Sequence, residues 1–211
     1  MKSALSVGLV DAGFLKAACA NTLQVKPSDV RIDYSELLVW FRQVASRINA
    51  PFLRSYWYDG AYDSSHPAHP AQRSEFNRVA DTPGFQLRLG HLEKRKAPWQ
   101  GSLRRAVKEC GWDIEELKSR FEMRDTYEQK GVDTLIVLDL VRMAQSETCS
   151  HVILMSGDRD LAEAVRTAQD AGTFVIVAHP KSTGISKEIA RLSDETIKLS
   201  DDLVRRIATH E

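Results

Sequence analysis

The sequence predicts an α/β protein with a mostly parallel sheet and helices on both faces. Short runs rich in Val, Leu and Ile recur along the chain, which is typical of strands buried on both faces. Stretches with a 3.6-residue apolar period separate several of these runs. The resulting order of strand, helix, strand, helix favours parallel pairing, because the helices serve as crossover connections.

The first half of the chain begins with a buried strand at residues 5–10 and a short helix at 14–19. Asp33 or Ser35 is expected to cap the next helix, whose apolar stripe runs from Leu37 to Ile48. Asp and Ser accept hydrogen bonds from a helix N-terminus, which makes either residue suitable. The remaining predicted elements are a strand at 52–58 stopped by Asp59-Gly60, a loop at 61–71, a helix at 72–80 and an alternating strand at 85–92.

The second half shows the same alternation more regularly. The predicted elements are an apolar helix at 130–144, a strand at 151–155, a helix at 161–171, a strand at 174–178, and helices at 186–191 and 201–208. Residues 93–129 are basic, aromatic and irregular. We interpret them as an insertion or lid within a single domain that spans residues 1–211.

Composition excludes several classes of protein. The 211 residues contain 29 basic and 29 acidic side chains, so any surface for nucleic acid must be local. Cys19, Cys110 and Cys149 are odd in number and lack ligand-like spacing, which predicts reduced thiols. No apolar run approaches the roughly 18 residues of a membrane span. The sequence therefore predicts a cytoplasmic protein without a membrane partner.

Carboxylates follow two of the predicted strands. Asp11 ends the first strand, and Asp158 and Asp160 come directly after the strand at 151–155. In a parallel sheet ligands bind beyond the carboxyl ends of the strands. Helix capping is the alternative for each aspartate, but several acids at one edge repel one another unless a cation or protons share the site. Asp158 is the firmer candidate ligand, because Asp160 can serve mainly as the cap of the next helix.

The helix at 130–144 carries two more acids. Asp133 lies near its start, where capping is again the alternative. Asp139 lies among apolar neighbours on the helical wheel, and a buried lone carboxylate is costly. A metal ion or a hydrogen-bond partner in the core must therefore compensate Asp139.

An oxygen-rich set of ligands favours Mg²⁺ or Mn²⁺ over zinc. Such an ion can activate water and stabilise the charge that develops on a phosphate oxygen. The sequence contains no evident Ser-His-Asp pattern, Walker A loop or GxGxxG loop. His66 and His69 are more typical of a solvated loop than of a metal site.

A basic and aromatic stretch is a candidate surface for nucleic acid. Basic side chains bind phosphates and exposed aromatic rings stack on unpaired bases. The alternative is a solvated helix face with both tryptophans turned into the core. The residues concerned are Arg88, His91, Lys94, Arg95, Lys96, Arg104, Arg105 and Lys108, around Trp99 and before Trp112.

Five blocks of the sequence resemble the NYN domain of the PIN-like nuclease superfamily, in its bacterial LabA-like branch. The matching blocks are VDAGFL at 10–15, YWYDG at 56–60, KGVDTLIVLDL at 130–140, LMSGDRDL at 154–161 and AGTFVIVAHP at 171–180. Many relatives have Asn three residues after the first Asp, where this chain has Phe14. Residues 93–129 have no counterpart in the resemblance.

The resemblance implies a PIN-like three-layer α/β/α sandwich and Mg²⁺- or Mn²⁺-dependent cleavage of RNA. Asp11, Asp133, Asp158 and Asp160 correspond to the acidic metal cluster, and Asp139 matches the second acid of its block. Lys130 is expected to approach substrate phosphate. Ser156 is expected to hydrogen-bond a carboxylate or a phosphate, or to shape its turn.

The leading hypothesis is thus a metal-dependent ribonuclease, with DNA not excluded as a substrate. A catalytically weak or inactive module that binds RNA or a protein is the main alternative, supported by Phe14 and the unmatched insertion. A small-molecule phosphatase or receiver-like phosphate switch fits the order of the blocks poorly. A second copy of the chain or another protein remains open as a partner.

Overall fold

A seven-stranded sheet forms the centre of the computed structural model, which describes residues 4–95, 102–113, 116, 126–146 and 149–210. The strand order is β5-β4-β3-β1-β6-β7-β8. All neighbouring pairs are parallel except β4 and β5, which pair antiparallel. The strands are β1 (Ser6–Asp11), β3 (Phe52–Ala61), β4 (Phe85–Arg95), β5 (Thr126–Lys130), β6 (His151–Met155), β7 (Phe174–Pro180) and β8 (Glu195–Leu199).

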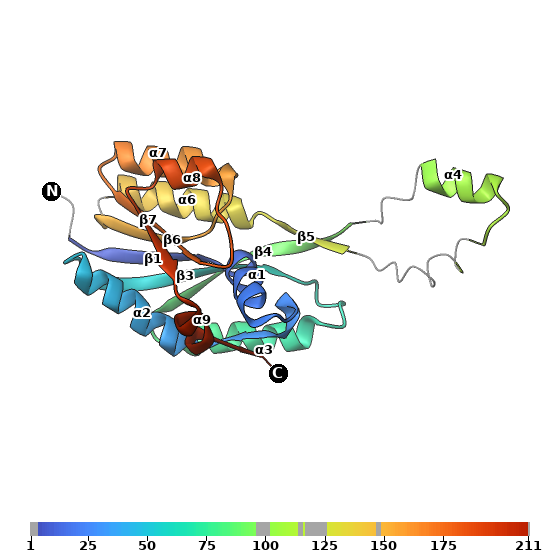
Figure 1. Ribbon diagram of the computed structural model, residues 1–211, viewed down its shortest axis with the longest axis horizontal. Helices are drawn as coiled ribbons and strands as arrows, with labels where there is room; N and C mark the ends of the chain where they lie inside the picture. The colour runs from blue at the N-terminus through green and yellow to red at the C-terminus, as the bar shows by residue number, and fades with distance from the viewer. Residues whose placement is uncertain (1–3, 96–101, 114–115, 117–125, 147–148, 211) are drawn as a thin grey trace.

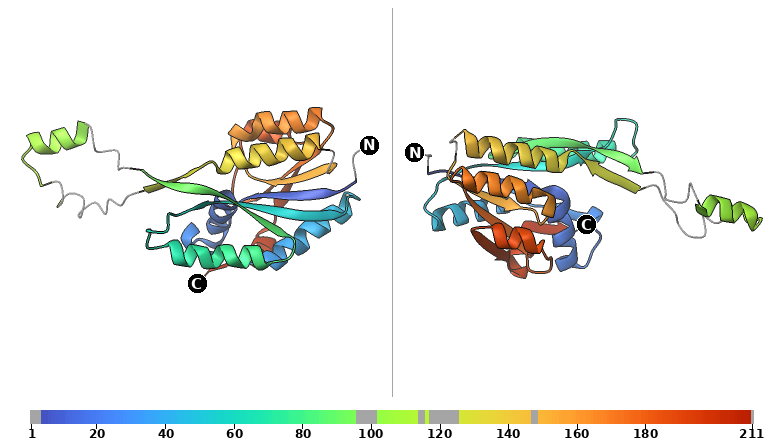
Figure 2. Two further views of the ribbon diagram at one scale, coloured as in Figure 1. Left: turned by 180° about the vertical axis from the view of Figure 1, so that it is seen from behind. Right: turned by 90° about the horizontal axis from the view of Figure 1, so that it is seen from above.

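Helices cover both faces of this sheet, as Figures 1 and 2 show. One face carries α1 (Ala12–Leu23), α2 (Tyr34–Arg47), α3 (His69–Asp81) and α9 (Asp201–Ile207). The other carries α6 (Val132–Gln145), α7 (Ala162–Asp170) and α8 (Lys187–Leu192). The predicted three-layer α/β/α sandwich is therefore confirmed.

Alternate residues of the central strands fill two separate cores. In β6, Ile153 and Met155 join the cluster beneath α1 and α2, whereas Val152 and Leu154 join the cluster beneath α6 and α7. Successive side chains of a strand point to opposite faces, so both sets must be apolar when both faces are covered. This explains why β6 reads as an unbroken apolar run in the sequence.

Several short elements complete the described chain. The strands β2 (Val30–Ile32) and β9 (Ala208–His210) form a separate antiparallel pair. Single-turn helices η1 (Pro27–Asp29) and η3 (Arg159–Leu161) precede β2 and α7. The helix α4 (Ser102–Glu109) lies apart from the sandwich, beyond the end of the β4–β5 hairpin (Figure 1).

Three predicted boundaries need correction. Asp59-Gly60 does not end β3, because Asp59 pairs with Leu89 and Gly60 with Gly90 in the neighbouring β4. Lys130 belongs to β5 and not to the following helix. At the two ends of the segment 93–129, residues 93–95 belong to β4 and residues 126–129 to β5, so the irregular stretch is limited to residues 96–125; its role as an insertion or lid stays a prediction.

Cys19 and Cys149 are buried and Cys110 is exposed, and all three are free, as predicted. Among the described residues, no helix combines the length and the apolar character needed to cross a membrane.

Candidate functional site

The carboxyl ends of the central strands bring the predicted acids to one edge of the sheet. Asp11 is the last residue of β1, and the turn that begins at Ser156 follows the adjacent β6. The helix α6 begins at Val132 next to the same edge. Because parallel strands end together, residues far apart in the sequence meet here. We call this region the acidic edge; its members are Asp11, Asp59, Asp133, Asp158 and Asp160.

Asp11 is the most deeply buried of the predicted ligands, with 9% of its surface exposed. One oxygen (Oδ1) accepts a hydrogen bond of 3.1 Å from the backbone N–H of Phe14 and so caps α1, while Oδ2 accepts one of 3.3 Å from Ser156 Oγ. Burial raises the pKa of Asp11 to about 6, and the negative charges of Asp133 and Asp59 contribute to that rise. Capping and membership of the acidic edge are therefore compatible.

Ser156 is buried next to Asp11 and does not reach the surface. It is 1% exposed, donates to Asp11, and its Oγ accepts from the backbone N–H of Asp158 at 3.4 Å. The predicted contact with substrate is therefore wrong, because a side chain enclosed to this degree has no access to a phosphate. The other two predicted roles, bonding a carboxylate and shaping the turn, are both confirmed.

The acidic edge contains three further acids, which are Asp133, Asp158 and Asp160. Asp133 lies in the first turn of α6, whose N-cap is Gly131, and partial burial together with Asp158 and Asp160 raises its pKa. Asp158 caps η3 by accepting from the backbone N–H of Asp160 at 2.9 Å. The capping role expected of Asp160 thus belongs to Asp158, and Asp133 makes no side-chain cap.

Asp59 is a member of the acidic edge that the sequence reading missed. It is 6% exposed and lies in β3. Its carboxylate accepts from Lys16 Nζ at 3.3 Å, from the backbone N–H of Gly60 at 2.8 Å, and from Gln129 Nε2 at 3.2 Å. An acid near the end of a strand in YWYDG was the available signal, but the Asp-Gly pair was interpreted as a turn.

Asp139 lies apart from the acidic edge. Six residues along α6 from Asp133 correspond to about 9 Å at 1.5 Å per residue. Its Oδ2 accepts from Tyr58 Oη at 2.9 Å and from Arg88 Nε at 3.2 Å. Of the two compensations predicted for this acid, the structure contains the hydrogen-bond partner, reinforced by an ion pair. We correct its assignment as a metal ligand accordingly.

Comparison with known proteins identifies the family of this chain. A family model described as the NYN domain matches residues 17–200. The chain belongs to the NYN domain family. NYN domains form part of the PIN-like nuclease superfamily, and the matched region contains Asp59, Asp133, Asp158 and Asp160, while Asp11 precedes it.

Two individual proteins resemble this NYN protein. The uncharacterized protein y4oD of Sinorhizobium fredii is 36% identical over 87 residues, which are 40% of this chain and 41% of that protein. The chain thus matches less than half of this relative's length. A crystal structure of a protein of unknown function, VPA0982 from Vibrio parahaemolyticus, has a TM-score of 0.54 at 19% identity and covers 95% of both chains. The latter similarity supports the fold alone.

Only some of the residues predicted to contact the substrate lie in the part of the chain that the structure describes. Lys130 ends β5, where its Nζ lies 3.1 Å from Glu128 Oε2. Arg105 is exposed on α4, and Trp112 is 64% exposed, so the alternative that both tryptophans face the core is wrong for Trp112. Lys96, Trp99 and the side chains of Arg95 and Arg104 lie outside the described residues.

The residues of the acidic edge that could hold a cation would supply only part of its ligands. Among the described residues, no three Asp, Glu, His or Cys side chains stand close enough to form a ready-made metal site. Mg²⁺ is commonly bound through one or two carboxylates together with substrate phosphates, and not by a cage of protein ligands. Burial is the main cause of the raised pKa values of Asp11 and Asp133, and the negative charges of neighbouring acids add to it.

Proposed function

We propose that this NYN protein is a metal-dependent ribonuclease. Asp11, Asp133, Asp158 and Asp160 would hold Mg²⁺ or Mn²⁺ at the acidic edge. One observation carries the proposal: in the described part of the chain these four carboxylates form no ion pair with Lys, Arg or His, whereas Asp59 and Asp139 are each paired. Four mutually repelling acids without cationic partners indicate a place for a divalent cation.

The surrounding residues prepare this edge for such chemistry. When bound, the metal would supply an activated water and stabilise charge on a phosphate oxygen. Asp11 is held by two hydrogen bonds, one from Phe14 N and one from Ser156 Oγ, so its carboxylate is oriented in advance. Asp133 lies in the first turn of α6, where the helix dipole opposes the rise in its pKa caused by burial and by neighbouring acids.

The approach of a polyanion requires positive charge beside the acids. Lys130, at the end of β5 and three residues before Asp133, supports this part of the proposal. Arg105 lies on α4, apart from the sandwich, and adds positive charge only at a distance from the acids. Attack by water does not use the 2′-hydroxyl, so cleavage of DNA is compatible with the same site. The assignment to RNA follows the family resemblance.

Phe14 favours a second candidate, a module that binds RNA without cleaving it. A Cβ added at Gly157 would come within 2.9 Å of Phe14 Cε2, so the ring lies against the turn that precedes Asp158. An apolar ring replaces a polar amide at this position, and the edge accordingly has one polar group fewer than many relatives.

A cleavage assay distinguishes the two candidates. Labelled RNA and DNA of identical sequence are incubated with Mg²⁺, Mn²⁺ or EDTA, using wild type, Asp158→Asn and Asp133→Asn. Asp139→Asn is the matched control, because it removes a charge from the same helix as Asp133 but outside the acidic edge. Metal-dependent cleavage that is lost in the first two variants and kept in the control supports the ribonuclease. Binding of RNA without cleavage in every metal supports the module.

A further inference from the structure

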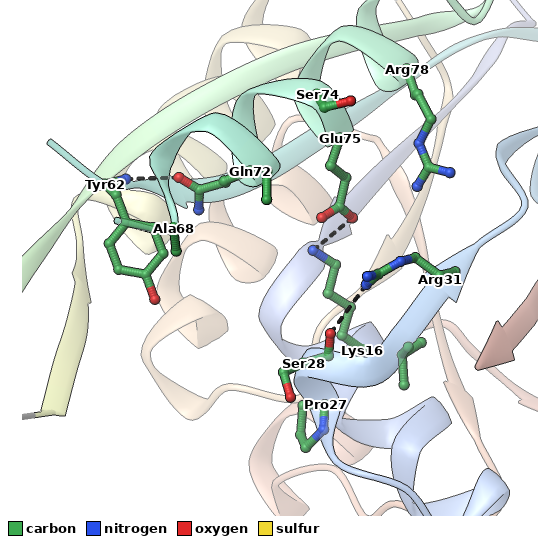
Figure 3. Close-up of a pocket in the computed structure, with 12 residues that line it drawn as sticks. Lys16, Pro27, Ser28, Arg31, Tyr62, Ala68, Gln72, Ser74, Glu75 and Arg78 are labelled. Carbon is green, nitrogen blue, oxygen red and sulfur yellow. Dashed lines mark hydrogen bonds and ion pairs between the residues drawn. The ribbon is translucent and has the colours of Figure 1, made fainter. Parts of the chain in front are cut away.

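A hollow of about 560 Å³ lies beside the acidic edge, on the face of the sheet that carries α1 and α3. Figure 3 shows side chains from α1, η1, β2 and α3 converging on it. Its volume is within the usual range of about 300 to 1,000 Å³ for ligand pockets. The polar side chains that line it and matter here are Lys16, Arg31, Tyr62, Gln72, Glu75 and Arg78.

Lys16 joins the hollow to the acidic edge. Its Nζ lies 2.9 Å from Glu75 Oε1 inside the hollow and 3.3 Å from Asp59 Oδ2 at the edge. Tyr34 Oη also donates to Glu75 at 3.2 Å. The Lys16–Asp59 ion pair therefore lies between the hollow and the proposed metal site, and a ligand long enough to pass it would extend from one to the other.

Two guanidinium groups make the hollow suited to an anion. Arg31 Nη1 donates to the backbone oxygen of Ser28 at 3.1 Å and lines the hollow from β2. Arg78 is exposed on α3, and in the described part of the chain no acid forms an ion pair with it. Both arginines also line a second, adjoining hollow. Guanidinium groups bind phosphate through paired, charge-assisted hydrogen bonds.

Tyr62 provides a flat apolar surface in the same hollow. Its ring stacks on His66 with centroids 3.9 Å apart and planes 5° from parallel. The Tyr127 centroid lies 5.2 Å from that of Tyr62 and 4.8 Å from that of His66, nearly perpendicular to both rings. Tyr127 is therefore beside the stack and not on top of it, so it leaves uncovered the face of Tyr62 turned away from His66.

We propose that this hollow binds one nucleotide of a single-stranded RNA whose neighbouring phosphate lies at the acidic edge. The base stacks on Tyr62 and the phosphate is held by Arg78. This proposal rests on the proposed ribonuclease function and assigns one base and one phosphate of its substrate to Tyr62 and Arg78. Stacking requires an unpaired base, which a continuous duplex does not present.

The charge contact is tested by RNA binding in EDTA. The affinity of a fluorescein-labelled single-stranded RNA is measured across a range of salt concentrations for wild type, Arg78→Gln and Arg73→Gln. Arg73 is the matched control: it is exposed on α3 and lies about 140° around the helix from Arg78. Loss of one phosphate contact should reduce the slope of log affinity against log salt by about 0.7 in Arg78→Gln, with no change in Arg73→Gln.

The stacking contact is tested with Tyr62→Leu and Tyr62→Phe. Removing the ring should weaken RNA binding roughly tenfold, as expected for one base–aromatic stack. Tyr62→Phe keeps the ring, so its affinity should lie closer to wild type than that of Tyr62→Leu. Melting temperatures of both variants establish that the surrounding loop is intact.

The outcomes separate this proposal from the proposed function. Equal affinities and salt slopes for Arg78→Gln and Arg73→Gln, or no RNA binding by wild type, would overturn the nucleotide site even if metal-dependent cleavage occurs. Loss of binding in Arg78→Gln without any cleavage by wild type would keep the nucleotide site and reject the ribonuclease. In cleaving conditions, Arg78→Gln should raise KM with little change in kcat, because Arg78 contacts the substrate away from the reacting phosphate.

Discussion

Asp11 and Asp139 are both acids among apolar residues, and the structure provides for them in opposite ways. Asp139 receives a hydroxyl hydrogen bond from Tyr58 and an ion pair from Arg88. Asp11 receives a backbone and a hydroxyl hydrogen bond and faces further acids. Asp139 is a structural carboxylate whose charge is balanced within the fold. Asp11 retains a charge that the fold leaves unbalanced. The presence or absence of a cationic partner therefore separates two roles that the sequence pattern assigned alike.

The same contrast holds between the two buried acids of the edge. Asp59 contacts Lys16, whereas Asp11 has no cationic contact among the described residues. Burial raises the pKa of both, and Lys16 opposes that rise at Asp59. Asp59 is therefore better interpreted as the anchor for Lys16 and Gln129 than as a ligand.

Cleavage should show the largest difference between the two classes of acid. Asp11→Asn removes a carboxylate from the proposed metal site and should reduce Mg²⁺-dependent cleavage of RNA by about 100-fold or more, since metal catalysis supplies several kcal/mol. Asp139→Asn should remain within about threefold of wild type. Initial rates with labelled RNA measure both. Equal losses of activity in the two variants would contradict the assignment of Asp11 as a metal ligand and Asp139 as a structural carboxylate.

Metal binding should stabilise the protein through the unbalanced acids alone. At a Mg²⁺ concentration 100 times its dissociation constant, wild type should gain about 2.7 kcal/mol in the free energy of unfolding. Asp133→Asn should lose most of that gain, and Asp139→Asn should keep it. Urea denaturation with and without Mg²⁺ provides the measurement, and an equal gain in Asp133→Asn would place the ion elsewhere.

Without metal, Asp11→Asn should make the protein more stable at neutral pH. The pKa of Asp11 rises from 3.8 to about 6 on folding, so the folded state retains the proton more strongly than the unfolded chain. Stability therefore falls as pH rises from about 4 to about 6, and the full penalty is present above 6. Removing this penalty should raise the free energy of unfolding by about 3 kcal/mol at pH 7.5.

The pH profile checks the cause of this gain. The advantage of Asp11→Asn in urea denaturation should disappear near pH 4, where Asp11 of the folded protein is already protonated. Asp139→Asn should have the opposite sign at neutral pH, with a loss of about 1 kcal/mol, because Arg88 loses its partner; Arg88 is 37% exposed, which limits the effect. An Asp11→Asn variant less stable than wild type at pH 7.5 would contradict the interpretation.

Ser156→Ala should weaken metal binding less than the loss of a ligand does, since Ser156 orients Asp11 and does not reach the substrate. Losing a hydrogen bond that orients a ligand commonly weakens metal affinity by 10 to 100 times, and about tenfold is expected for a single 3.3 Å bond. Isothermal titration with Mn²⁺ measures the affinity. Because Asp158 N also bonds Ser156 Oγ, Ser156→Cys, which keeps a weaker hydrogen-bonding group, should lie between wild type and Ser156→Ala.

The pattern of residues alone predicted the central strands well where both faces are buried. β6 was predicted with its observed bounds, because an apolar run of that length has few alternatives. β8 was missed: its residues alternate between partly buried and exposed, and β7 is its single neighbour at the sheet edge. β2 and β9 were missed because three-residue strands leave almost no periodicity to detect.

The sequence by itself determined that the acids after β1 and β6 belong to one edge, because parallel strands end together and these acids follow the strand ends directly. Asp133 of α6 was added by the family resemblance, since α6 follows the antiparallel β5. The sequence did not determine which acids the fold would neutralise. Arg88 lies 51 residues from Asp139 and Lys16 lies 43 residues from Asp59, and neither pairing leaves a local pattern. The tertiary structure decided both, because ion pairs depend on distances across the packed layers. It thereby decided which carboxylates keep their charge for a ligand.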